Sequence, residues 1–566
     1  MPAATSSQAS LDRSHARDAF AVLVLAAAGL VLAFHIFPTD MLLDRWSWWE
    51  GVSGDVASSL AGWIRVAQEP WGWPPLHVES LDPPVGGNAI FMDVLPLLAL
   101  PGKLWFQLSG ELNPYFGRWT LLCFVLQGPA AYLVLRQYAV DRVPAALGAL
   151  LILLTPALMA RAGVAHVNLL AHFVILLAIL SYARATRAAG KVELACWAVI
   201  FPVALLTHPY LFAMSLPTML AGFIDAAQRG RISWPGALLL IGASLAVTLV
   251  IAFLLGIIGN GSVPSGSLGY YAMNVLSPVM PQFSQLPGFE NYELDATGGQ
   301  YEGYNYLGLS GLALIAIAFV VGRRDLRLLP SCNPALVTAL ILLTAFAISP
   351  VVYVGHWLVV KIPYRWVPLI SDMASQFSSS GRFFWPVGYI LLLASIILIW
   401  RQLGRTVVIA IVGVAIAVQF WETTPLRARV PDAYQFADHI DRPLWTSLLS
   451  RHSELAIYPD YQCTPTGLRG AMLQVQLLAA RADIPSNATY FNRKRINCKK
   501  PPTPDRMINP TTPDPLVLVY PDNITGKLNM PVLDPSFGCV RGEQSIVCSK
   551  HASDPDLLKL GTPLAH

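Results

Sequence analysis

The chain has 566 residues, of which 54% are hydrophobic and only 13% carry a charge. Soluble globular domains carry roughly 25% charged residues, so this composition excludes a soluble globular enzyme, a disordered protein and a coiled coil. The net charge of +4 is small and its basic residues are scattered, which gives no reason to expect nucleic acid as a partner. We therefore predict a polytopic α-helical membrane protein.

Eleven apolar stretches approach the roughly 20 residues that a helix needs to cross a bilayer. They cover residues 20–37, 119–135, 144–160, 167–183, 194–207, 211–224, 237–258, 307–322, 335–348, 384–400 and 406–421. A further apolar stretch at 94–106 is interrupted by two prolines and one lysine. We expect this stretch to form a helix on the membrane surface.

The basic residues between these stretches indicate one orientation. If the N-terminus is cytoplasmic and 94–106 does not cross, every compact Arg and Lys cluster between spans falls on the cytoplasmic side, as the positive-inside rule requires. The predicted organisation is then a cytoplasmic tail at 1–19, a transmembrane domain at 20–421 and an exported domain at 422–566. The outer loops of the transmembrane domain are 38–118, 259–306 and 351–383.

The exported domain contains four of the seven cysteines, which are Cys463, Cys498, Cys539 and Cys548. Four cysteines in an oxidising compartment predict two disulfides with three open pairings, and the alternative is four free thiols. A helix-like run at 470–482 and strand-like runs at 454–458, 515–520 and 545–548 predict a small α/β domain. Because Arg outnumbers Lys and Ala and Leu fill the spans, we expect a bacterial inner-membrane protein with this domain in the periplasm.

The first outer loop combines acidic and aromatic residues. Eight acidic residues and six tryptophans lie between residues 40 and 93. Asp55 begins a helix-compatible run, and a carboxylate near aromatic rings is suited to act as a general base. The alternative for Asp55 is a helix N-cap. Asp93 precedes the surface helix and has the same two interpretations.

Three other outer segments contain polar residues next to predicted spans. His166 lies between the third and fourth spans, where it either packs or binds a metal or a phosphate. Arg382 follows Ser380 at the start of the tenth span, which suits recognition of a lipid phosphate, and the alternative is a snorkelling arginine. Glu302 and Tyr306 lie in a tyrosine-rich segment that predicts an aromatic belt or a sugar platform.

Six segments together resemble the GT-C superfamily of integral-membrane glycosyltransferases, and more narrowly a bacterial family within it. They are SGDVASSLAGW, EPWGWPP, FMDVLPLLALPGKLW, AHVNLLAHF, YEGYNYLGLSGL and SSSGRFFWPVGY. These segments span residues 53–389, so the resemblance covers most of the membrane part and little of the tail.

The resemblance implies transfer of a sugar from a polyprenyl-phosphate-type lipid carrier to an envelope glycan, lipid or protein acceptor on the periplasmic face. It assigns the catalytic carboxylate to Asp55, with Asp93 second. Members that place this acid nearer the first span leave Asp40 and Asp44 open. A divalent metal (Mg or Mn) held by Asp93, His166 and Glu302, or alternatively Arg382, would bind the carrier phosphate, with Tyr306 and Ser380 in the same site.

Two other functions compete with glycosyl transfer. One is a transporter or flippase for lipid-linked sugars, and the other is a non-catalytic assembly factor for envelope polysaccharide. Transporters carry ionisable residues near the bilayer midplane and often contain inverted repeats. Here the predicted spans are nearly uncharged at their centres and no internal repeat is visible, which favours the transferase.

Overall fold

The computed structural model describes residues 3–564 apart from 84, 188–190, 259–267, 326, 328–332, 364–375, 492–495, 502–513, 530 and 532. The chain forms two compact units, each built from separate stretches of sequence. The first, here called the helical unit, contains Met1–Leu43, Phe116–Val250 and Pro264–Tyr434. The second, here called the mixed unit, contains Asp44–Tyr115, Ile251–Val263 and Gln435–His566.

The helical unit consists mainly of long apolar helices joined by short turns. Its helices are α1 (Ala3–Ile36), α2 (Thr39–Leu42), α6 (Phe116–Gln137), α7 (Arg142–Leu153), α8 (Pro156–Ala162), α9 (His172–Arg187), α10 (Lys191–Thr207), α11 (Pro209–Gln228), α12 (Trp234–Leu254), α13 (Leu309–Val321), α15 (Pro334–Ile348), α17 (Trp385–Gln402), α18 (Arg405–Glu422) and α19 (Thr424–Ala433). Short 3-10 helices η2 (Val167–Leu170), η3 (Gln300–Gly303) and η5 (Ser380–Phe384) and the antiparallel hairpin of β3 (Val351–Val354) and β4 (Trp357–Lys361) lie between them.

Within the described residues, eight helices are long and apolar enough to cross a membrane. They are His15–Ile36, Phe116–Gln137, Arg142–Ala162, Val167–Arg187, Pro209–Gln228, Trp234–Leu254, Ser380–Gln402 and Arg405–Glu422. The helices α13 and α15 are also apolar but shorter. This confirms the predicted class of helical membrane protein, whereas the predicted number of eleven spans stays a prediction.

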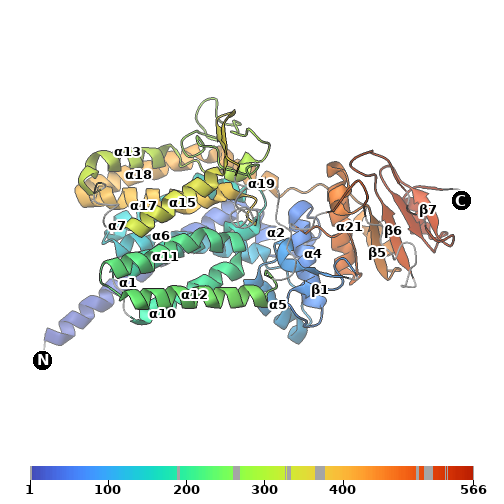
Figure 1. The fold of residues 1–566 in the computed structure, drawn as a ribbon, viewed down its shortest axis with the longest axis horizontal. Coiled ribbons are helices and arrows are strands. Elements are labelled where there is room, and N and C mark those ends of the chain that lie inside the picture. The colour runs from blue at the N-terminus through green and yellow to red at the C-terminus, as the bar shows by residue number, and fades with distance from the viewer. Residues whose placement is uncertain are drawn as a thin grey trace. The chain divides into compact units, whose positions relative to one another are not determined.

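The helices of this unit pack closely where small residues face a neighbour. A Cβ at Gly29 of α1 would lie 2.1 Å from the carbonyl oxygen of Phe124 in α6, so only glycine permits this approach. Helices α13, α15, α17 and α18 lie side by side (Figure 1). The exposed side chains of α12 include Leu238, Leu239 and Leu249, and a helix with such an apolar outer face suits contact with lipid.

The mixed unit combines the predicted first outer loop with the tail. Its helices are α3 (Trp46–Trp49), α4 (Gly54–Gln68), η1 (Ala89–Met92), α5 (Pro96–Ser109), α20 (Arg442–Leu449), η6 (Tyr461–Cys463), η7 (Thr466–Leu468), α21 (Arg469–Arg481) and α23 (Pro555–Lys559). Its strands are β1 (His77–Val78), β2 (Gly87–Asn88), β5 (Glu454–Tyr458), β6 (Pro515–Val519), β7 (Gly538–Arg541), β8 (Ile546–Ser549) and β9 (Thr562–Pro563).

Five of these strands form one sheet in the order β5-β6-β8-β7-β9. Strands β5 and β6 are parallel, and α21 lies between them in the chain, while the remaining pairs are antiparallel. The sequence predicted β5, β6, β8 and α21 to within a residue or two, but not the short strands β7 and β9. Disulfides join Cys463 to Cys498 and Cys539 to Cys548, which confirms the two predicted bridges. Such bridges are typical of an exported, oxidising compartment.

The acidic and aromatic segment 44–115 is bonded to the tail within the mixed unit. Helix α4 packs against α21 (Figure 1). The Arg65 guanidinium donates to the Asp483 carboxylate at 2.7 Å, and that of Arg481 donates to Glu50 at 2.9 Å. The sequence places this segment in an outer loop of the transmembrane domain, and these domain boundaries stay a prediction.

The interrupted apolar stretch 94–106 forms α5 of the mixed unit. The Lys103 side chain is buried, and its ammonium group donates to the carbonyl of Pro70 at 3.1 Å. The same ammonium group lies 4.7 Å from the centre of the Trp71 ring. The charge that interrupts this stretch is therefore held by a carbonyl and an aromatic face.

Candidate functional site

Three basic or titratable side chains of the helical unit meet around one carboxylate. Glu302 Oε2 accepts from Arg161 Nη2 at 2.5 Å and from Arg382 Nε at 2.8 Å. His166 Nδ1 lies 3.7 Å from Glu302 Oε1 and 2.9 Å from Arg161 Nη1. We call Arg161, His166, Glu302 and Arg382 the Glu302 cluster. Arg161 lies at the end of α8, and His166 directly precedes η2. Glu302 lies in η3, and Arg382 lies in η5.

Two glycines allow the segments that carry Glu302 and Arg382 to approach each other. A Cβ at Gly381 would lie 2.5 Å from the Cα of Gly303, so larger side chains would push these backbones apart. The side-chain amide of Asn305 donates to the carbonyls of Gly303 and Gly381, both at 2.9 Å. The residues that follow Glu302 and precede Arg382 thus form a fixed backbone clamp.

The Glu302 cluster is largely shielded from solvent. Side chains of Glu302, Arg161 and Arg382 are 3%, 4% and 8% exposed, while that of His166 is 25% exposed. Burial would raise the pKa of Glu302, but the charges of Arg161, Arg382 and His166 lower that pKa well below its ordinary value. Two guanidinium groups therefore share one ionised carboxylate.

Aromatic faces complete the surroundings of the two guanidinium groups. The Arg161 guanidinium carbon lies 5.5 Å from the centre of the Trp385 ring, and that of Arg382 lies 4.9 Å from the Tyr210 ring. Rings at this distance stabilise a cation that has lost its water. The arrangement keeps both arginines charged in an apolar setting.

A cavity of about 120 Å³ lies beside the cluster in the helical unit. Its lining includes Tyr301, which directly precedes Glu302, and also Gln282, Glu293 and Arg429. Partial burial and the charge of Asp295 raise the pKa of Glu293, against the lowering effect of Arg429. A carboxylate with a raised pKa at a cavity is a candidate acid or base.

Some buried polar atoms near the cluster have no hydrogen-bond partner among the described residues. They are Ser380 Oγ, Asn305 Oδ1 and Trp385 Nε1. Native proteins pair the large majority of buried polar groups, so unpaired ones suggest a site for a ligand. Hydrogen-bond donors and an acceptor therefore accompany the two guanidinium groups.

Three of the site residues predicted from the sequence meet in this cluster, namely His166, Glu302 and Arg382. Ser380 lies two residues from Arg382 and is fully buried. Tyr306 contacts a different acid, because its hydroxyl donates to Glu422 at 2.7 Å. The carboxylate of Glu422 also accepts from the backbone of Leu309 at 2.7 Å, so it anchors the start of α13.

The two predicted catalytic aspartates belong to the mixed unit. Asp55 lies in the first turn of α4 and Ser53 is the residue before the helix, so the alternative prediction of Asp55 as N-cap is wrong. Burial and the charge of Asp55 raise the pKa of Tyr461 to about 12, so the two side chains are near each other. Asp93 follows η1 with a positive φ of 59° and does not cap α5, whose N-cap residue is Leu95.

The residues predicted to hold a divalent metal belong to different units, Asp93 to the mixed unit and His166 and Glu302 to the helical unit. Within the described ranges, no group of three or more His, Cys, Asp or Glu side chains gathers as metal ligands. Such sites normally need several oxygen or nitrogen ligands from the protein. The described residues therefore do not fit the predicted metal, and we derive no step through it.

Sequence reasoning missed Arg161, Glu293 and Arg429. Arg161 ends an otherwise apolar span, and a charge at such a position is costly unless it has a role. That rule would have identified Arg161. The cavity that brings Glu293 and Arg429 together forms between segments far apart in the chain, so no local pattern marks them.

Two family models match the chain. The sequence model of a family described as "Domain of unknown function (DUF6311)" matches residues 26–424, and that of the "DUF6311 C-terminal domain" matches residues 444–550. The chain belongs to the DUF6311 family. A comparison with curated proteins finds no match. In this DUF6311 protein the Glu302 cluster lies in the first matched region and the two disulfides lie in the second.

Proposed function

We propose that this DUF6311 protein is a membrane glycosyltransferase of the GT-C type, which transfers a sugar from a polyprenyl-phosphate-type carrier to a cell-envelope acceptor. The Glu302 cluster is the observation that supports this proposal. Two buried arginines that share one carboxylate suit a phosphate, because the guanidinium fork matches phosphate oxygens. The unpaired atoms of Ser380, Asn305 and Trp385 add further polar contacts nearby.

In the proposed reaction, an acceptor hydroxyl oxygen bonds to the anomeric carbon of the sugar. The bond between that carbon and the carrier phosphate oxygen breaks, and the polyprenyl phosphate leaves with the electron pair. Arg161 and Arg382 stabilise the charge that develops on the departing phosphate. The hydroxyl proton passes to a carboxylate.

Two carboxylates are candidates for this base. Glu293 has a raised pKa and lines the cavity beside the Glu302 cluster. Asp55 is the candidate that the resemblance assigns, and it lies beside Tyr461 in the mixed unit. Glu293 is the preferred base because it belongs to the same compact unit as the arginines.

The proposal includes a membrane topology. We infer eleven spans, with α10, α13 and α15 crossing in addition to the eight long helices. The apolar helices α13 and α15, the apolar stretch 194–207 within α10 and the alternation of basic clusters support this number. The N-terminus is then cytoplasmic, and the disulfide-bonded domain lies in the periplasm of a bacterial inner membrane.

The proposal is tested in a deletion strain by mass spectrometry of envelope glycans. The expected result is a missing sugar that wild type and Arg405→Gln restore, while Arg382→Gln does not. Arg405 is a matched control because it is an exposed arginine of the same unit. Full restoration by Arg382→Gln, in a strain that makes normal amounts of protein, would refute the phosphate-binding role.

The same strain separates the candidate bases and the rival functions. Loss of the sugar in Glu293→Gln but not in Asp55→Asn assigns the base to Glu293, and the reverse assigns it to Asp55. In liposomes, the purified protein should form a new glycosidic bond with a polyprenyl-phosphate sugar. Movement of the lipid-linked sugar across the bilayer without bond formation would instead identify a flippase.

A further inference from the structure

A second and larger crevice lies at the other end of the helical unit. It has a volume of about 370 Å³, within the range of roughly 300–1,000 Å³ found for small-molecule sites. Helix α17 begins beside the Glu302 cluster, and it lines this crevice from Ile390 to Arg401, about 8 to 24 Å further along at 1.5 Å per residue. None of the described residues that line the crevice belongs to the Glu302 cluster. The two sites are therefore separate.

Basic side chains gather at the mouth of this crevice. Three arginines and one aspartate are among the described residues that line it, namely Arg187, Arg229, Arg401 and Asp325. Arg187 is the last residue of α9, Arg229 directly follows α11, and Arg401 is the penultimate residue of α17. Asp325 lies four residues after the end of α13. The basic clusters predicted to be cytoplasmic occupy the same ends, so the mouth is at the height of lipid headgroups.

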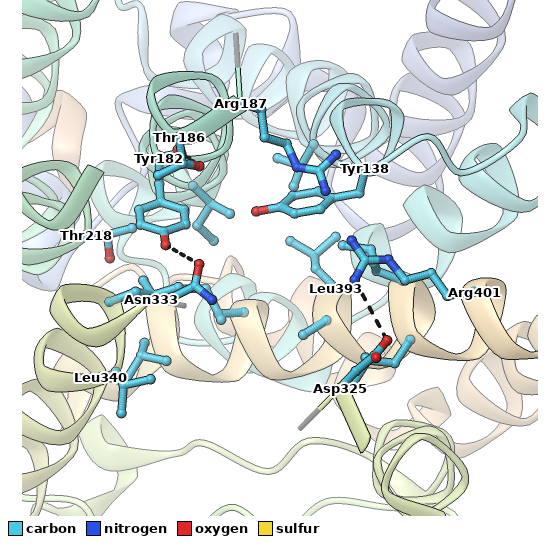
Figure 2. A pocket seen from close by; sticks show the side chains of 18 of the residues that line it. Tyr138, Tyr182, Thr186, Arg187, Thr218, Asp325, Asn333, Leu340, Leu393 and Arg401 are labelled. Carbon is cyan, nitrogen blue, oxygen red and sulfur yellow. Dashed lines mark hydrogen bonds and ion pairs between the residues drawn. The ribbon is translucent and has the colours of Figure 1, made fainter. Parts of the chain in front are cut away.

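The contacts of these arginines hold them in place and keep them charged. The Arg187 guanidinium carbon lies 4.4 Å from the centre of the Tyr138 ring, and Arg187 donates to the carbonyl of Gln137 at 2.9 Å. Arg401 Nη1 lies 3.9 Å from Asp325 Oδ2, and Arg229 Nη2 donates a hydrogen bond to Asn333 Oδ1. Figure 2 shows Arg187 over the Tyr138 ring and Arg401 directed toward Asp325.

All three arginines also act on Tyr138. Burial raises the pKa of Tyr138, while Arg187, Arg229 and Arg401 each lower it. Three guanidinium groups therefore influence one hydroxyl group.

Beyond the mouth, the crevice is lined by apolar side chains. They include Ile179, Leu336, Leu340, Ile390, Leu393 and Ile397. Ile390 lies eleven residues before Arg401 on α17, so the crevice extends about 16 Å from the mouth at 1.5 Å per residue. This depth matches one leaflet, because the hydrocarbon core of a bilayer is about 30 Å thick.

We propose that the crevice binds an anionic phospholipid of this leaflet, with its phosphate among Arg187, Arg229 and Arg401 and one acyl chain along the apolar wall. The arginines at the mouth favour an anionic headgroup. The apolar wall favours a lipid with an acyl chain over a free anion. The bound lipid fills the space between α9, α11, α15 and α17 and holds these helices together. This site is independent of the proposed sugar transfer.

Native mass spectrometry of the purified full chain tests the proposal. Protein reconstituted with equal amounts of phosphatidylglycerol and phosphatidylcholine should retain phosphatidylglycerol. The Arg187→Gln/Arg401→Gln variant should bind it about 30-fold more weakly, which is the loss expected for two basic residues at a lipid surface. Ala394→Trp, which fills the apolar part of the crevice, should also lose the lipid although all charges remain.

The matched control is Arg323→Gln/Arg324→Gln, which removes the same charge from exposed positions outside the crevice. It should bind phosphatidylglycerol like wild type. Equal retention by the control and by the Arg187→Gln/Arg401→Gln variant would overturn the proposal. So would competition by inorganic phosphate as strong as by the lipid, because the site would then recognise the anion alone.

Discussion

The acidic segment of the mixed unit and the Glu302 cluster of the helical unit use charge in opposite ways. Segment 44–115 is dense in carboxylates, and those of Glu50 and Asp82 bond to the tail. The Glu302 cluster contains one carboxylate between two arginines, in a unit whose helices are almost entirely apolar. Its charges come from three separate stretches of sequence and meet only in the fold.

The difference shows which charges are informative in a membrane protein. Where acids are abundant, many of them join neighbouring segments. Arg65 binds Asp483, for example, and the carboxylate of Glu69 accepts from the backbone of Glu79 at 2.6 Å. An isolated charge at the end of an apolar helix costs free energy and therefore points more strongly to function. The following predictions test this contrast.

The largest effect is expected from Glu302→Gln. Removing the carboxylate leaves two buried guanidinium groups without their shared partner, and breaking a buried pair costs about 3–5 kcal/mol. Denaturant unfolding of the protein in detergent measures this loss. Glu290→Gln is the control, because Glu290 is an exposed acid of the same loop. Equal free energies of unfolding for the two variants would show that the cluster does not stabilise the helical unit.

The same variant has a distinct dependence on pH. Because the folded-state pKa of Glu302 lies below its ordinary value of 4.5, its stabilisation is fully present above that value and is lost as the pH falls further. Wild type should therefore lose its advantage over Glu302→Gln between about pH 4.5 and 2, as unfolding curves at several pH values would show. A constant difference down to pH 2 would contradict the ionised carboxylate.

In the mixed unit, removing a disulfide should lower the free energy of unfolding nearly as much as Glu302→Gln does in the helical unit. Replacing Cys463 and Cys498 by Ser opens a loop of 35 residues and should cost about 4 kcal/mol, against about 3 kcal/mol for the loop of 9 residues between Cys539 and Cys548. Hydrogen exchange of strands β6 and β8 in the full chain measures both losses. A larger loss for the shorter loop would show that loop entropy does not govern this unit.

A smaller effect is expected where the backbones of the cluster meet. Gly381→Ala places a Cβ 2.5 Å from the Cα of Gly303, and such overpacking costs about 1–3 kcal/mol. Thermal unfolding in detergent measures the loss, and Gly404→Ala is the control because nothing lies within 4 Å of its Cβ. If both variants unfold at the same temperature, η3 and η5 are less tightly apposed than described.

The smallest effect is expected from Asp483→Asn in the mixed unit. The Asp483 side chain is 72% exposed, so its pair with the buried Arg65 should contribute about 1 kcal/mol or less. Urea unfolding of Asp483→Asn measures this contribution. The control is Glu543→Gln, because Glu543 is an exposed acid of the same unit. A loss as large as that of Glu302→Gln would reverse the contrast between the two regions.

Local pattern predicted the elements of this fold well. Apolar runs of helical length became helices, and the β-rich run 515–520 became β6, because both depend on neighbours in sequence. Polar residues at the ends of spans identified His166, Glu302 and Arg382 as candidates. That a phosphate binds them stays a prediction.

Contacts between residues far apart in the chain could not be predicted from the sequence. Arg65 and Asp483 are 418 residues apart, and nothing local to either indicates the other. Hydropathy therefore assigned segment 44–115 to the membrane domain. Arg161 was passed over because it adjoins an apolar stretch, although it donates the shortest hydrogen bond to Glu302.

The divided layout of the mixed unit has a consequence for biosynthesis. Its first part ends at Tyr115 and its last part starts at Gln435, so roughly 320 residues must be translated between them, which takes about 16–64 seconds at 5–20 residues per second. During that interval the tryptophan-rich first part lacks the strands and helices that cover it. Newly made chains must therefore be protected from aggregation until the ribosome has nearly finished, and a tail expressed by itself would lack its packing partner.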